Sequence, residues 1–158
     1  MKSLQEQVRT MQRDWPQFSP SLGLGPASVV WFGDLRGLDR HFHISVEYGL
    51  PMRGRTDLYR FMPVVRVLRP SMVPNFEAAD EAPLPHMYFE GPDIRLSPLC
   101  LFDPKANQWD GSMFISRTTI GWASRWLASY EFWEATGKWV GGGRHDEPDQ
   151  TKEAQHAA

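Results

Sequence analysis

The feature that most limits the fold of this chain is a long helical pattern near its C-terminal end. Between Ser116 and Thr136 apolar side chains recur at helical spacing, and Gly137 supplies a stop signal. The recurring positions are Ile120, Ala123, Trp126, Leu127, Tyr130 and Trp133. A helix with such a stripe buries it against a second layer of structure. The rest of the chain must therefore supply an apolar surface for this helix to cover.

Segments with strand character lie upstream of this helix. Arg40–Tyr48 alternates apolar and polar side chains, which is the pattern of a strand with one buried face. Ala27–Phe32 and Phe61–Leu68 are also predicted strands, because they are rich in β-branched and aromatic residues. We expect Gly33–Gly37 to form a turn and Gly49–Thr56 to form a turn-rich connection.

The remaining segments complete an α+β layout. Met1–Arg13 is predicted to be a short amphipathic helix, and the stretch from there to Pro26 a loop. The apolar face of that helix consists of Leu4, Val8 and Met11. Ser71–Pro98 is rich in proline and is expected to be irregular. The order indicates an N-terminal helix and an antiparallel sheet covered by the long helix.

Length and composition narrow the function. A chain of 158 residues fits one domain, and we expect residues 1–145 to form it and residues 146–158 to be a flexible polar tail. A net charge of −2 gives no support for nucleic-acid binding. No segment has the length and hydropathy of a membrane span, and the polar start is unlike a signal peptide. The single cysteine cannot form an internal disulfide, which favours a reducing cytoplasm.

That cysteine, Cys100, has two interpretations. It lies between Leu99 and Leu101 after the proline-rich segment, so it fits a small buried hydrophobic residue. It also fits a catalytic nucleophile, provided that the sulfur is accessible. The residues alone leave both open.

The motifs around Cys100 favour the second interpretation. Arg60–Pro70 resembles the strand motif of ubiquitin-conjugating enzymes, and Pro85–Tyr88 lies where that family has its His-Pro-Asn motif. Leu99–Leu101 resembles the family's catalytic-cysteine motif, Trp109 its following tryptophan, and Ser116–Leu127 its next helix. The resemblance covers about residues 1 to 136 and implies the ubiquitin-conjugating-enzyme (UBC-like) fold.

A longer resemblance connects the chain with the stand-alone ubiquitin-conjugating-like proteins of type II bacterial CBASS antiphage systems. It rests on Leu99–Pro104, Trp109, Thr119–Ala123, Trp126–Trp133 and Thr136–His145. The resemblance implies that Cys100 carries the C-terminus of a cGAS-like nucleotidyltransferase as a thioester. The enzyme would then pass it to an amine or another nucleophile on a target and so prime cyclic-nucleotide signalling. No cofactor is expected.

The resemblance also suggests roles for neighbours of Cys100. His86 lies at the histidine of the His-Pro-Asn motif and is expected mainly to brace its loop. Tyr88 stands where the family has asparagine, so its hydroxyl is a candidate donor to the oxyanion, although packing also explains a tyrosine. Asp103 and Asn107 either orient an incoming amine or are solvated loop residues.

Two further patterns have plainer explanations. His41 and His43 share one face of a predicted strand and have the spacing of metal ligands, but no third ligand is evident nearby. A polar outer face explains the pair better, and a metal hydrolase is the weakest hypothesis. Gly141–Gly143 is not a phosphate loop, because no strand precedes it and no Lys-Ser/Thr follows. It is expected to be a flexible turn that brings Trp139 or His145 back toward the domain.

The stronger alternative to an enzyme is a binding module of the same fold. The absence of an asparagine at the His-Pro-Asn position motivates it, because inactive variants of the family bind partners without transferring them. Such a protein would regulate the nucleotidyltransferase by association alone. The sequence leaves open how the acyl group is activated, which target accepts it, and the oligomeric state.

Overall fold

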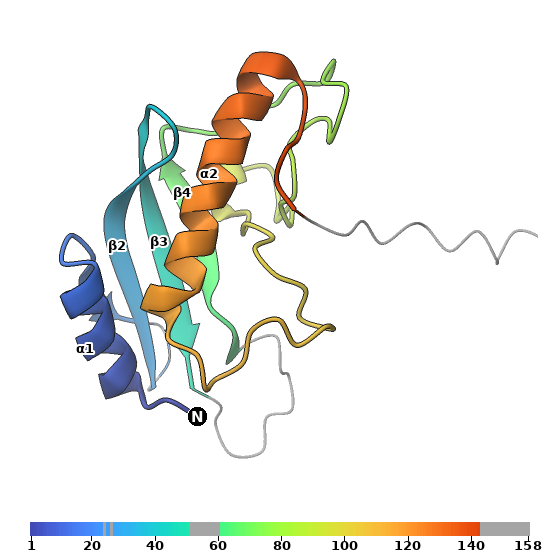
Figure 1. The fold of residues 1–158 in the computed structure, drawn as a ribbon. Coiled ribbons are helices and arrows are strands. Elements are labelled where there is room, and N and C mark those ends of the chain that lie inside the picture. Colours follow the sequence, from blue (N-terminus) through green and yellow to red (C-terminus); the bar gives the residue numbers. More distant parts are fainter. Residues whose placement is uncertain (24, 26, 51–60, 143–158) are drawn as a thin grey trace, which may run out of the picture.

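The computed structural model describes residues 1–23, 25, 27–50 and 61–142. Its elements in chain order are α1 (Leu4–Asp14), β1 (Ser19–Leu22), β2 (Ser28–Arg36), β3 (His41–Gly49), β4 (Val64–Arg69), the short 3-10 helices η2 (Ile94–Leu96) and η3 (Ile115–Arg117), and α2 (Thr119–Thr136). The strands form one antiparallel sheet in the order β1-β2-β3-β4, and α2 crosses one face of it (Figure 1). This arrangement confirms the predicted α+β class and is consistent with the UBC-like fold.

The sheet faces α2 with one set of alternating side chains. On β3, Phe42, Ile44 and Val46 are fully buried, as their period-two spacing predicts. Trp31 of β2 is the register partner of Val46 and is also fully buried. The stripe on α2 covers these side chains, and its tyrosine, Tyr130, meets the Phe42 ring edge-on at 6.2 Å between centroids. The helix–sheet interface is therefore a largely aromatic core.

A buried carboxylate fixes α2 against the turn between β2 and β3. Glu131 accepts hydrogen bonds from the backbone N–H groups of Leu38 and Arg40, the latter at 3.0 Å. The guanidinium of Arg40 also contacts this carboxylate at 3.1 Å. Burial by itself raises the pKa of Glu131, but the backbone hydrogen bonds lower it, and the net shift is downward. The charged form of Glu131 is thus the one that the fold stabilises.

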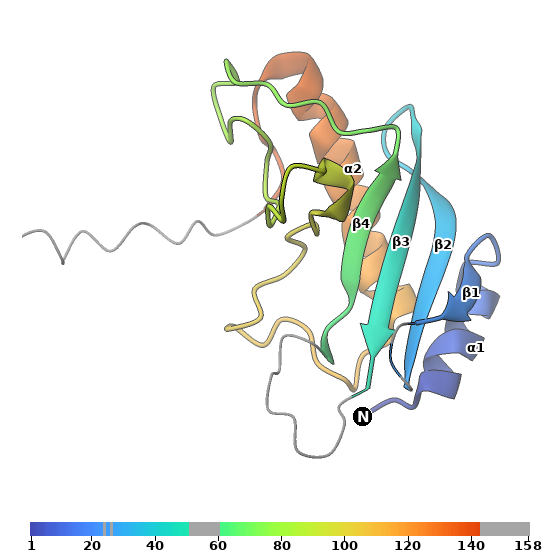
Figure 2. The same cartoon turned by 180° about the vertical axis from the view of Figure 1, so that it is seen from behind.

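The first helix, α1, packs beside β1 and β2 at the edge of the sheet opposite β4 (Figure 2). Ser3 and Glu6 form a capping box, with the Glu6 N–H donating to the Ser3 hydroxyl at 3.2 Å. The predicted apolar face is only partly correct. Met11 is fully buried as expected, but the polar Gln7 is buried as well. The Gln7 amide donates to the Met113 carbonyl at 2.8 Å and accepts from the Ile115 N–H at 3.0 Å, so it anchors η3.

Two predictions near the N-terminus are wrong. The segment expected to be a loop contains β1, which pairs with β2 but is exposed along its length, so it has no alternating pattern to reveal it. The predicted turn at Gly33–Gly37 is instead mostly strand, because β2 continues to Arg36. A Cβ on Gly33 would lie 2.7 Å from the Phe18 ring. This glycine therefore permits close packing rather than a turn.

The other element boundaries differ less. β4 begins at Val64, so Phe61–Pro63 of the predicted strand precede it. The long helix begins at Thr119 because a 3-10 turn, η3, occupies Ile115–Arg117. It ends at Gly137, whose φ of 71° is the left-handed conformation expected of a glycine stop.

Ser71–Pro98 is irregular as predicted, apart from η2. The predicted connection Gly49–Thr56 lies mostly outside the described residues, as does the tail 146–158. Within the described ranges, no helix is long and apolar enough to cross a membrane.

Candidate active site

The segment that carries Cys100 is fixed to the free edge of the sheet. The Leu99 N–H donates to the carbonyl of Val65 on β4 at 2.9 Å, and Leu99 also pairs with Met87 in an isolated antiparallel bridge. Leu99 is buried while Cys100 is half-buried, as expected for neighbours in an extended segment. The backbone therefore turns Leu99 into the core and leaves the Cys100 side chain facing a pocket.

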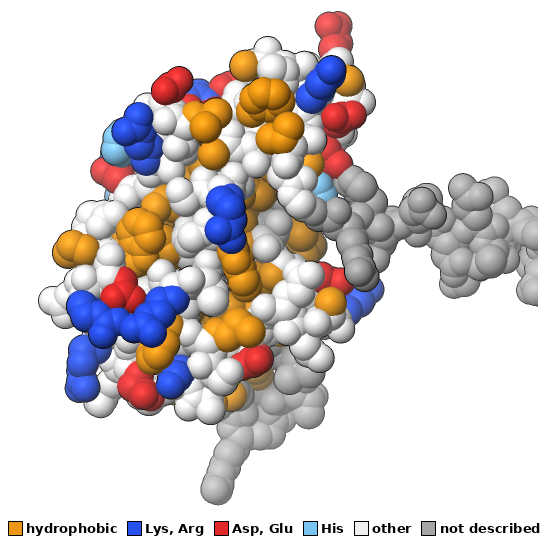
Figure 3. Space-filling view, in the orientation of Figure 1, with side chains coloured by type: hydrophobic (Ala, Val, Ile, Leu, Met, Phe, Trp, Pro, Cys, Tyr) orange, Lys and Arg blue, Asp and Glu red, His pale blue; other side chains and the backbone are white. Residues whose placement is uncertain are grey.

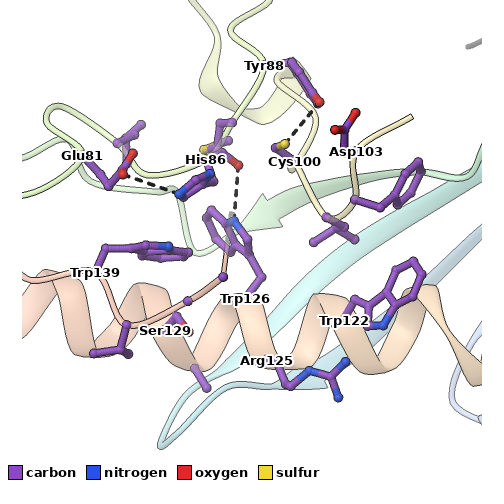
Figure 4. Close-up of a pocket in the computed structure, with 18 of the residues that line it drawn as sticks. Glu81, His86, Tyr88, Cys100, Asp103, Trp122, Arg125, Trp126, Ser129 and Trp139 are labelled. Atoms are coloured by element: carbon purple, nitrogen blue, oxygen red, sulfur yellow. Dashed lines mark hydrogen bonds and ion pairs between the residues drawn. The ribbon is translucent and has the colours of Figure 1, made fainter. Parts of the chain in front are cut away.

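This pocket has a volume of about 1060 Å³ and is lined by three parts of the chain. The Cys100 segment and the residues from Glu81 to Tyr88 form one side (Figure 4). One face of α2 forms the second side. Residues 139–142, which follow α2 and which we call the strap, form the third. Cys100 lines the pocket rather than filling the core, so the geometry fits the accessible-thiol interpretation better than the buried one.

Tyr88 is the side chain that contacts the sulfur. Its hydroxyl oxygen lies 3.2 Å from Cys100 Sγ, which donates a hydrogen bond to it in the neutral thiol. The Tyr88 N–H donates to the Pro98 carbonyl at 2.9 Å, which holds the two segments together. Tyr88 is 50% exposed, so it is not a core tyrosine. Its hydroxyl is placed where it can also donate to a negative charge at or beside the sulfur.

His86 contacts Cys100 through its backbone rather than its ring. The His86 carbonyl accepts from the Cys100 N–H at 2.9 Å and from Trp126 Nε1 at 3.3 Å. The ring turns the other way, with Nε2 3.5 Å from a Glu81 carboxylate oxygen and the ring centroid 5.2 Å from that of Trp139 (Figure 4). This geometry suits a residue that braces the loop.

Of the two polar candidates that follow Cys100, only Asp103 lines the pocket. Its carboxylate accepts from the Lys105 N–H at 2.8 Å, and its own N–H donates to the Gln108 side chain at 2.8 Å. Asn107 is not among the lining residues, and its φ of 51° assigns it to a tight turn. Gln108 also lines the pocket, although nothing in the residues around it singles it out.

The strap and the α2 wall were not predicted as parts of the site. Trp139 packs against Trp126 with the two rings tilted by 58° and their centroids 5.7 Å apart, so the chain after Gly137 does return to the domain. A Cβ on Gly141 would lie 2.4 Å from the Trp139 indole, which shows how closely this glycine packs. On α2 the spacing of Trp122, Arg125 and Ser129 could have indicated a second helical face, had the core stripe been subtracted first. His145 lies outside the described residues.

The two histidines on β3 are separate from this pocket. His43 Nδ1 lies 2.7 Å from the Asp34 carboxylate, and its ring stacks on Phe32. Among the described residues, no group of three histidine, cysteine or acidic side chains is placed to hold a metal ion. His41 and His43 thus lie on the polar face of the sheet, which accounts for their alternation.

The fold and this pocket define an α+β domain of the ubiquitin-conjugating-like class with a thiol at the mouth of a groove. Residues 7–146 match the family model described as the type II CBASS E2 protein, and the chain belongs to that family. It is therefore an E2-like protein associated with CBASS. A comparison with curated proteins finds no match.

Proposed function

We propose that the protein is a conjugating enzyme that forms a thioester through Cys100 with the C-terminus of a cGAS-like nucleotidyltransferase. The observation that carries this proposal is the position of Cys100, half-buried at a pocket of about 1060 Å³ and in contact with the Tyr88 hydroxyl. A pocket of this size has room for an extended peptide tail. Membership of the CBASS E2 family supports the choice of donor.

The proposed chemistry is acyl transfer in two steps. The Cys100 thiolate attacks the activated carbonyl at the donor's C-terminus, a C–S bond forms, and the activating group leaves. An amine of the target then attacks the thioester, an amide forms, and the Cys100 thiol is released. The activating group must come with the donor, whose carboxyl group is otherwise unreactive toward a thiol.

Three neighbours of Cys100 have distinct proposed roles. Tyr88 donates a hydrogen bond to the oxyanion that forms as each nucleophile adds to the carbonyl, the task of the absent asparagine. His86 holds the loop through its carbonyl and does not act as a base. Asp103, whose carboxylate lies at the pocket, orients the incoming amine. The reaction takes place in the cytoplasm and requires no cofactor, nucleic acid or membrane.

The test combines the purified protein with a cGAS-like nucleotidyltransferase whose C-terminus is prepared as a thioester, so that the donor is activated. A non-reducing gel should show an adduct that a reductant dissolves and that is missing in Cys100→Ala. An adduct that survives in Cys100→Ala contradicts the proposal. Conjugation to targets is followed separately, as reductant-resistant species in cells under phage challenge.

A second candidate is a binding module that regulates the nucleotidyltransferase without chemistry. The observation that favours it is Tyr88, which stands in place of the family's asparagine. Phage protection that persists in cells carrying Cys100→Ala would support this alternative, and loss of protection with normal protein levels would contradict it.

A further inference from the structure

One face of α2 is turned to the pocket and carries an unusual mixture of side chains. Trp122, Arg125, Trp126 and Ser129 follow the i, i+3, i+4, i+7 spacing of a single helical face, and all four line the pocket. Trp126 also belongs to the buried core stripe of the same helix, whereas Arg125 is exposed. The Arg125 side chain is therefore not part of the core and is available to a ligand.

Arg125 is the charged member of this face. It is exposed, and within the described part of the chain its guanidinium has no ion-pair or hydrogen-bond partner. Arg40 shows the contrast, because it engages the carboxylates of both Glu131 and Glu134. In the surface view, which has the orientation of Figure 1, basic side chains stand among hydrophobic ones on the face that α2 covers (Figure 3). Arg125 is the only Lys or Arg in that helix.

The charges around the pocket are arranged on opposite sides. Asp103 lies on the Cys100 side, while Arg125 lies across from it on α2 (Figure 4). Glu81, the other acidic lining residue, faces the His86 ring. A carboxylate on a bound ligand is therefore repelled near the sulfur and attracted near α2. Arginine is also the side chain best suited to hold a carboxylate, because its planar fork donates two parallel hydrogen bonds.

We infer that Arg125 is a specificity-determining residue, which binds an acidic side chain in the C-terminal tail of the acyl donor. This inference rests on the proposed function, since the tail reaches Cys100 only if the protein carries it as a thioester. With the last carbonyl at Cys100, an extended tail advances about 3.3 Å per residue. The acidic side chain therefore lies a few residues before the end of the tail, against Trp122 and Arg125. Its carboxylate completes the pairing that the guanidinium lacks.

The test uses synthetic peptides as probes, so it does not depend on the natural donor or its activation. Each is a fluorescent peptide that ends in a glycine ethyl thioester. The peptides differ at one position only, which carries Asp, Asn or Lys. This variable position is placed at successive residues near the C-terminal end, so that each is tested in turn. The Cys100 thiolate attacks the thioester carbonyl and ethanethiol leaves, so loading is read as fluorescent protein on a non-reducing gel. The proteins are the full chain, Arg125→Ala, Arg125→Glu and, as a matched charge change on the exposed face of α1, Arg9→Glu.

At one position of the scan, the Asp peptide should load about three- to tenfold faster than the Asn peptide, as expected of a partly desolvated ion pair. Arg125→Ala should abolish that preference, Arg125→Glu should transfer it to the Lys peptide, and Arg9→Glu should retain it. Loading of the Asn peptide should be the same in the full chain and in Arg9→Glu. Equal loading of Asp, Asn and Lys peptides at every position, or an Asp preference that survives in Arg125→Glu, overturns the assignment and leaves the proposed function standing. Failure of every peptide to load on Cys100 contradicts the proposed function itself.

Discussion

The sulfur of Cys100 and the hydroxyl oxygen of Tyr88 lie 3.2 Å apart at the mouth of the pocket. They lie in two irregular stretches on either side of η2, which are held together by the Met87–Leu99 bridge and by the hydrogen bond from the Tyr88 N–H to the Pro98 carbonyl. The irregular segment between β4 and η3 thus places a nucleophile and a hydrogen-bond donor side by side.

Tyr88→Phe should slow both loading and discharge of Cys100 by about tenfold or more, since it removes one donor to the developing oxyanion. The half-exposed ring remains, so the free energy of unfolding should change by less than about 0.5 kcal/mol. Single-turnover loading with a peptide thioester and discharge to a free amine measure the two steps separately. Unchanged rates for both steps would remove Tyr88 from the mechanism.

His86→Ala should act on stability first. It removes a nearly buried ring that faces Glu81 and packs on Trp139, so the free energy of unfolding should fall by about 1–3 kcal/mol. Loading should slow because the loss of the ring's contacts with Glu81 and Trp139 loosens the backbone whose carbonyl holds the Cys100 loop. The decisive readout is the shape of the pH–rate profile, which should match that of the wild type. Loss of one limb of that profile would instead identify His86 as an acid or base.

The strap offers a matched pair of glycines. Gly141→Ala places a methyl group 2.4 Å from the Trp139 ring, so either the indole or the strap must move, whereas Gly142→Ala meets nothing within 4 Å. We expect Gly141→Ala to lower the free energy of unfolding by about 1–2 kcal/mol and to shift the tryptophan emission spectrum. Gly142→Ala should do neither. Equal behaviour of the two variants in urea unfolding would show that the strap does not pack on the pocket in solution.

Glu131→Gln tests the carboxylate beneath the β2–β3 turn. The pKa of Glu131 is lowered in the folded protein, so its stabilisation is present above the unfolded pKa of about 4.3 and is lost as the pH falls through the folded value. At pH 7 the free energy of unfolding of the variant should be lower by about 2 kcal/mol, because hydrogen bonds to a charged acceptor are replaced by weaker ones to a neutral amide. The difference from the wild type should shrink in acid.

Urea unfolding of Glu131→Gln at neutral and acidic pH measures that trend. Glu134→Gln is the control, because Glu134 is more exposed and contacts the side chains of Arg40 and Tyr130 rather than the turn backbone. Glu134→Gln should lower the free energy of unfolding by less than Glu131→Gln does. If the difference in free energy of unfolding between the wild type and Glu131→Gln grew in acid, this would contradict the claim that the fold stabilises the charged form of Glu131.

The sequence predicts a helix or strand well where one face of that element is buried, because burial imposes a periodic pattern of apolar residues. β3 and α2 each have one face in the core, so their alternating and helical patterns predict them well. β1 is held by backbone pairing and buries no side chain, so nothing in its sequence indicates it. The sequence predicts a turn at Gly33 because glycine serves both turns and close contacts, and only the position of Phe18 separates the two.

The candidate site was predictable only in part, for a related reason. Cys100 and Tyr88 could be identified by resemblance to a family, but their contact depends on a loop with no repeating pattern. The direction of the His86 ring depends on Glu81 and Trp139, which lie far apart in the chain. The sequence does not indicate that Arg125 lines the pocket, because the apolar core stripe dominates the helical pattern of α2 and obscures the residues that face the pocket.

The most direct test of the account is to identify the bond at residue 100. Cys100→Ser replaces the labile thioester with a more durable oxygen ester, so the adduct with the co-expressed nucleotidyltransferase should accumulate and resist reductant. Peptide mapping by mass spectrometry should then find the last residue of the nucleotidyltransferase joined to the side chain of residue 100, and alkaline hydroxylamine should release it. An adduct joined to any other residue, or one that forms equally in Cys100→Ala, would contradict the central claim.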